Sequence, residues 1–264
     1  MFDCARNGRG AMDFLRRNAG VLSKNATIFQ NEDLLEPYVD RRVMFLAAPN
    51  RTNLPLFWSF GWHGNKTLAK MDVLYALPRV LFWVPFLREL LVFSGAVEGD
   101  EENLIWLMKK EARAICYAPG RMQEALTVQS RGCTKTCSLN PEFITQLIAK
   151  EVVVVPVVFV GENKRYPPLL LTPEDTALGK NNWYKYLVMT VLFLRKRSYQ
   201  LIDYPFPLFF GWNRKEKVTT IIGPPIDTKT YLPGHPEKVC NAVQGSWASM
   251  GNTLDNVLLI EDVV

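Results

Sequence analysis

Residues Val152–Val160 read VVVVPVVFV, a run of β-branched and aromatic side chains without a polar or charged residue. A strand tolerates such a run only when both of its faces are covered, so the run predicts a central strand of a parallel sheet. Pro156 inside the run argues against a fully central position, because proline has no N–H for the ladder of backbone hydrogen bonds.

Three further apolar runs, each ended by a turn, predict strands at Val43–Ala48, Ala114–Ala118 and Thr219–Ile222. Helical spacing of apolar residues marks four other segments. The expected helices are Leu74–Val97, Asn103–Lys110, Phe143–Ala149 and Ser246–Leu259. Strands that alternate with helices predict an α/β fold, in which a mostly parallel sheet is flanked by helices in a single domain.

Composition excludes several classes of protein. Of the 264 residues, 48% are hydrophobic and 22% charged, which is ordinary for a globular domain and excludes disorder or a collagen-like repeat. The net charge of +5 suits an anionic membrane surface or a phosphate-bearing ligand better than specific DNA binding, so we expect no nucleic-acid partner. The five cysteines lack disulfide-framework or zinc-ligand spacing, so we expect free thiols and no metal site.

The longest uncharged stretch, Val239–Leu254, is interrupted by polar residues, so no segment is expected to span a bilayer. Two aromatic-rich segments followed by cations, Trp183–Leu194 and Tyr204–Trp212, are typical of an interfacial membrane contact. For the first segment a buried helix with basic residues in its last turn is an equal alternative. The residues expected at the membrane are Trp183, Phe206, Phe209, Phe210 and Trp212.

Four stretches carry a resemblance to a known family: Asp33–Leu46, Leu77–Gly95, Val152–Asn163 and Val218–Ile226. In their order and spacing they resemble the type-two diacylglycerol acyltransferase family, which includes the monoacylglycerol and wax-ester acyltransferases. The resemblance covers residues 26–260 and implies a glycerolipid-acyltransferase-like domain at residues 26–264, after a basic N-terminal segment at residues 1–25. It also implies transfer of a fatty acyl group from acyl-CoA, as substrate and without a cofactor, to a lipid hydroxyl at a membrane.

The family's catalytic motif is altered in this chain. A hydroxyl is a poor nucleophile at neutral pH and needs a base, which the family supplies from a His-Pro-His-Gly motif at the end of its first core strand. Here the position reads Ala48-Pro49-Asn50-Arg51, without a histidine. His63, in a Gly-Trp-His-Gly stretch, and Glu124, which matches the family's Gly-Gly-x-x-Glu-x-Leu loop, are the catalytic candidates if the chain is active.

Loops at the carboxyl ends of parallel strands usually hold the functional residues, which directs attention to Pro49–Thr52, Pro119–Glu124 and Gly161–Arg165. There Arg121 stands where the family has a glycine that lets the chain approach a ligand closely. The family's basic stretch ending in Gly-Phe is matched by Ser138–Phe143, which holds no cation. By resemblance, the substrate-binding candidates are Gly120, Arg121, Phe143, Glu162 and Asn163.

The stretches that form the family's scaffold are thus retained, while the stretches that hold its catalytic and ligand-binding residues are altered. We expect a catalytically degenerate acyltransferase-fold protein that serves as a lipid-binding or structural subunit, with membrane lipids or an acyl lipid and other protein subunits as partners. The alternative is an active acyl-CoA:acylglycerol O-acyltransferase. We expect the chain to lie peripherally on an intracellular membrane, that of the endoplasmic reticulum by family, while the arginine-rich residues 1–25 leave a mitochondrial membrane open.

Overall fold

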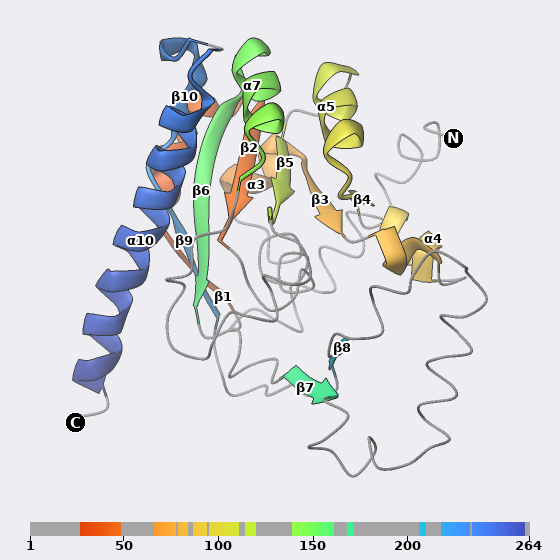
Figure 1. The fold of residues 1–264 in the computed structure, drawn as a ribbon. Helices are drawn as coiled ribbons and strands as arrows, with labels where there is room; N and C mark the ends of the chain where they lie inside the picture. Colours follow the sequence, from red (N-terminus) through yellow and green to blue (C-terminus); the bar gives the residue numbers. More distant parts are fainter. Residues whose placement is uncertain are drawn as a thin grey trace.

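A central sheet organises the chain, whose computed structural model describes residues 27–48, 66–77, 79–83, 87–93, 95–110, 114–119, 139–160, 168–171, 206–209, 218–232 and 234–261. Within them lies an eight-stranded sheet of order β1-β9-β6-β2-β5-β3-β4, with β10 also paired to β6 (Figure 1). The strands are β1 (Thr27–Gln30), β2 (Val43–Ala47), β3 (Val73–Leu77), β4 (Ala96–Glu98), β5 (Ala114–Tyr117), β6 (Val153–Val160), β9 (Val218–Ile222) and β10 (Ile226–Asp227).

Five strands, from β4 through β3, β5 and β2 to β6, run parallel. The strands β9 and β10 run antiparallel to β6, and β1 is parallel to β9. Apart from this sheet, β7 (Pro168–Leu171) pairs antiparallel with β8 (Phe206–Phe209). This pair lies beyond the carboxyl ends of the parallel strands (Figure 1).

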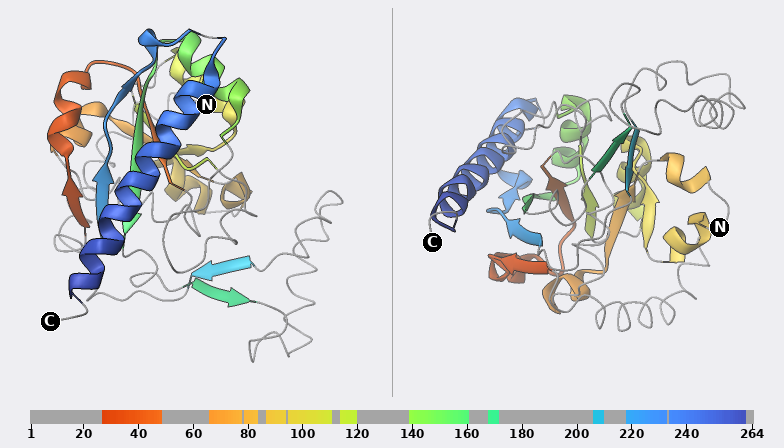
Figure 2. Two further views of the ribbon diagram at one scale, coloured as in Figure 1. Left: turned by 60° about the vertical axis from the view of Figure 1, so that its left-hand side comes forward. Right: turned by 90° about the horizontal axis from the view of Figure 1, so that it is seen from below.

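Helices cover both faces of the sheet and make two cores. On one face, inward side chains of the strands pack with residues of η1 (Glu32–Tyr38), α3 (Lys66–Met71), η3 (Arg79–Trp83) and α4 (Leu87–Phe93). On the other face they pack with α5 (Glu101–Lys110), α7 (Pro141–Ala149) and α10 (Pro236–Glu261). Figure 2 shows α7 and α10 on one side of the sheet and α3 on the other. The predicted α/β fold with a mostly parallel sheet is confirmed.

The strand β6 is central, as the run Val152–Val160 predicted, and its residues from Val153 to Val158 are buried. Pro156 is tolerated there because the antiparallel pairing on one side of β6 is interrupted opposite Pro156, between β9 and β10. The Gly223 N–H donates to the Pro156 carbonyl at 2.8 Å, so the Pro156 nitrogen also faces this interruption, where the antiparallel ladder has a gap. The missing N–H therefore falls outside the positions of β6 that pair with β9 and β10.

Two helix predictions need correction. Helical spacing predicted one helix over Leu74–Val97, but Val73–Leu77 form strand β3, and the described residues between β3 and β4 form two short helices, η3 and α4. The apolar VLYAL run at residues 73–77 is a buried strand, and Pro78 follows it, where a continuing helix would lack a backbone donor. The last helix begins at Pro236, ten residues before the predicted start, because proline suits the first helical position.

The long helix α10 is fixed to the sheet at two points. Trp247, 4% exposed, donates its indole N–H to the Leu46 carbonyl at 3.1 Å. Gly223 lies so close to α10 that a Cβ there would stand 2.9 Å from the Met250 Cε atom and 3.1 Å from the Pro156 carbonyl oxygen. A side chain at position 223 would therefore require the end of the Met250 side chain and the Pro156 carbonyl to shift.

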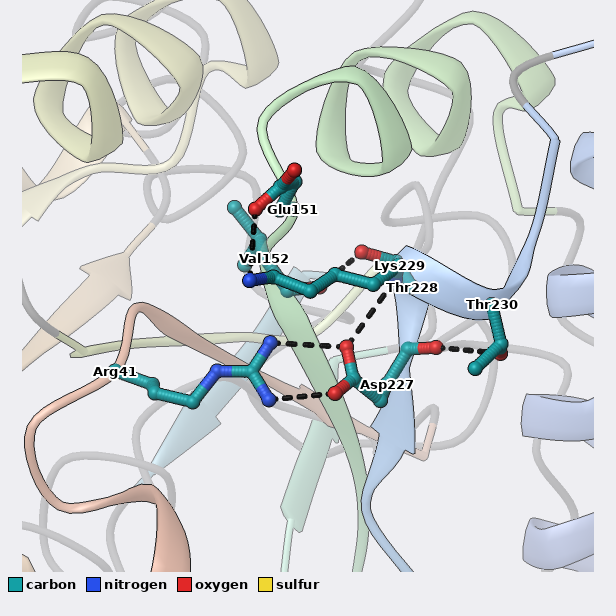
Figure 3. Close-up of polar contacts among 7 residues, drawn as sticks. All are labelled: Arg41, Glu151, Val152, Asp227, Thr228, Lys229 and Thr230. Carbon is teal, nitrogen blue, oxygen red and sulfur yellow. Dashed lines mark hydrogen bonds and ion pairs between the residues drawn. The ribbon is translucent and has the colours of Figure 1, made fainter.

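A network of polar contacts lies at the amino ends of β2 and β6, at the edge of the sheet opposite to the carboxyl ends of the parallel strands (Figure 3). The Arg41 guanidinium donates to both Asp227 carboxylate oxygens, at 2.5 and 2.9 Å. The Lys229 ammonium lies 3.0 Å from the Glu151 carboxylate, and the buried Thr228 hydroxyl donates to the Val152 carbonyl at 2.8 Å. These contacts tie the turn after β10 to the starts of the two central strands.

Candidate functional site

The carboxyl ends of β2, β5 and β6 meet at one edge of the sheet, which is where an α/β fold places its ligands. Ala48, directly after β2, is 2% exposed, and its backbone N–H donates to the Val157 carbonyl at 2.7 Å. Its methyl group belongs to the core beneath α5, α7 and α10. The first residue of the altered motif is therefore an inert, buried group fixed by the sheet.

Most of the other predicted site residues lie outside the described residues, so their roles stay predictions. These are Pro49, Asn50, Arg51, His63, Gly120, Arg121, Glu124, Glu162, Asn163, Trp183, Phe210 and Trp212. Of the aromatic residues predicted at the membrane, Phe206 and Phe209 form the two ends of strand β8, opposite Leu171 and Pro168.

Phe143, a predicted substrate-binding residue, lies in the first turn of α7 and is 3% exposed. Its ring meets the Tyr117 ring edge-on, with ring centres 5.6 Å apart and planes at 69°. The preceding turn explains why the helix begins here: Asn140 accepts from the Glu142 N–H at 3.0 Å, and Pro141 takes the first helical position. Phe143 thus packs under the carboxyl edge next to β5.

A hydroxyl, a carboxylate and an amide meet beside this aromatic pair, and the sequence reasoning missed them. The Tyr117 hydroxyl donates to one oxygen of Glu101 at 3.3 Å, and the Asn140 amide donates to the other at 2.6 Å. Tyr117 ends strand β5, Glu101 begins α5 and Asn140 caps α7, so three elements converge on one carboxylate. A tyrosine at the end of an otherwise apolar strand was the available signal.

The described residues offer few other groups that could bind a metal ion or take part in a reaction. They hold no cluster of three or more His, Cys, Asp or Glu side chains that could bind a metal ion. Burial raises the pKa of the Cys116 thiol well above its usual value, and Cys116 and Cys240 are free thiols. His235 is exposed, lies 3.0 Å from the Glu237 carboxylate and belongs to the turn before α10. Of the described helices, none combines the length and the apolar character needed to cross a bilayer.

Comparison with known structures defines the class of fold. The chain is similar to the crystal structure of the 1-acyl-sn-glycerophosphate acyltransferase PlsC from Thermotoga maritima, with a TM-score of 0.51 and 14% sequence identity. The likeness covers 96% of this chain and 84% of that chain. The fold is that of a glycerolipid acyltransferase.

The family is shown by its sequence model. The model described as diacylglycerol acyltransferase matches residues 65–242, about two thirds of the chain. The chain belongs to the diacylglycerol acyltransferase family. No curated protein matches it significantly. The matched residues include Tyr117, Glu101 and Phe143 but begin after Ala48–Arg51 and after His63.

Proposed function

We propose that this chain is a catalytically degenerate member of its family, which binds an acyl lipid at a membrane surface without transferring the acyl group. The observation that carries the proposal is the methyl group of Ala48 at the carboxyl end of β2, where the family's motif begins with a histidine. In this proposal the chain serves as a lipid-binding subunit of a membrane-associated assembly.

The proposal follows from the chemistry of the altered motif. Acyl transfer to a hydroxyl requires a group that accepts the hydroxyl proton near neutral pH. Alanine has no such group, the asparagine amide is not basic, and the arginine guanidinium stays protonated. None of the three replacements in Ala48-Pro49-Asn50-Arg51 can therefore take the role of the motif histidines.

Lipid binding is supported by what the chain retains. The valine-rich strand β6 ends at the edge where the fold places its ligands, and the apolar core around Phe143 packs beneath that edge. The segment at residues 183–212 is rich in aromatic residues and is followed by cations, as in peripheral membrane proteins. Together they favour a lipid ligand taken from a membrane, with protein subunits as further partners.

The family match itself favours a second candidate, an active acyl-CoA:acylglycerol O-acyltransferase. In that case His63 or a base that the sequence does not identify would accept the proton and Glu124 would orient it, with acyl-CoA as donor. This candidate predicts turnover by the wild type, which is lost when His63 is replaced by alanine if His63 is the base. A catalytically degenerate protein would give no turnover, either as wild type or as the His63→Ala variant.

The deciding experiment is an acyl-transfer assay on the purified protein with labelled oleoyl-CoA and either monoacylglycerol or diacylglycerol. The wild type and the His63→Ala variant are expected to give only the background of a protein-free reaction, while the wild type floats with liposomes. Turnover by the wild type contradicts the proposal, and its loss in the variant identifies the base. Flotation that is unchanged when Phe209 and Phe210 become serine would place those two residues away from the membrane contact.

A further inference from the structure

We draw no further inference here: the strongest candidate, the buried Thr220 hydroxyl in the middle of β9, lies between Phe29 and Phe159 in the sheet register and has no hydrogen-bond partner among the described residues, but nothing in that part of the chain shows a cavity beside it that a ligand could occupy.

Discussion

Two ion pairs at the amino edge of the sheet should differ strongly in strength although they lie in the same network (Figure 3). Arg41 makes two hydrogen bonds to Asp227, and the two side chains are 29% and 31% exposed. Lys229 makes a single contact with Glu151 at 3.0 Å, and these side chains are 53% and 62% exposed. Geometry and solvent screening both favour the first pair.

The structure sets the expected magnitudes. A bidentate pair of arginine and carboxylate with partly buried side chains should contribute about 1–2 kcal/mol of coupling free energy. An exposed lysine–glutamate contact is screened by water and contributes about 0–0.5 kcal/mol. The coupling of Arg41 with Asp227 should therefore be the larger by a clear margin.

Double-mutant cycles measured by urea unfolding compare the two pairs directly. One cycle uses Arg41→Met with Asp227→Asn, which keeps an acceptor for the Lys229 backbone N–H that Asp227 now bonds at 3.1 Å. The other uses Lys229→Met with Glu151→Gln. Equal coupling energies in the two cycles would refute the reasoning, because exposure and geometry would then have no effect.

The pH dependence gives a second measurement of the same pair. The hydrogen bond from Arg41, more than the opposing desolvation, lowers the pKa of Asp227 below its usual 3.8. A carboxylate with a lowered pKa stabilises the folded state fully above its unfolded-state value and loses this stabilisation as pH falls through the folded-state value. The coupling should be constant from neutral pH to about pH 5 and should fade below pH 3.8.

Three further predictions concern the core and the edges. Gly223→Ala should lower the free energy of unfolding by about 1–3 kcal/mol because the added methyl group crowds the Pro156 carbonyl oxygen and the Met250 side chain, and Met250→Ala should restore only the part that is due to Met250; additive losses would contradict a contribution from Met250. Asn140→Ala should lose about 1 kcal/mol and Asn140→Ser much less, because serine still caps α7; equal losses in urea unfolding would assign the effect to the Glu101 bond. Burial and its raised pKa should keep Cys116 unreactive towards a thiol reagent until the protein unfolds, and labelling of the native protein, located by peptide mass, would contradict this.

The buried strands of the fold were predictable because burial leaves a direct mark on the sequence. The runs at Val43–Ala48 and Val152–Val160 are apolar at every position except for one proline, and both form central strands. The strand at Val73–Leu77 was missed because it adjoins a segment with apolar residues at helical spacing, and such short runs fit both periods.

The polar sites were less predictable, because their partners are distant in the chain. Arg41 and Asp227 are separated by 186 residues, and no sequence pattern around either residue predicts that the two will pair. Glu101 begins α5, two residues before the predicted start of that helix, and its bond to Tyr117 depends on how α5 lies over β5. At the altered motif, the residue types alone showed that Ala48–Arg51 hold no histidine, and the structure adds the burial of Ala48.

The order of the strands in the sheet also constrains how the protein is made. The first described strand, β1, pairs with β9, whose residues are synthesised almost 200 positions later, and the Asn31 amide then donates to the Ile222 carbonyl. A chain that emerges from the ribosome can assemble its parallel strands β2 to β6 first, while β1 stays unpaired until β9 has been synthesised. Closure of the sheet is therefore a late step, and translation that stops before residue 218 would leave an edge of β6 open to aggregation.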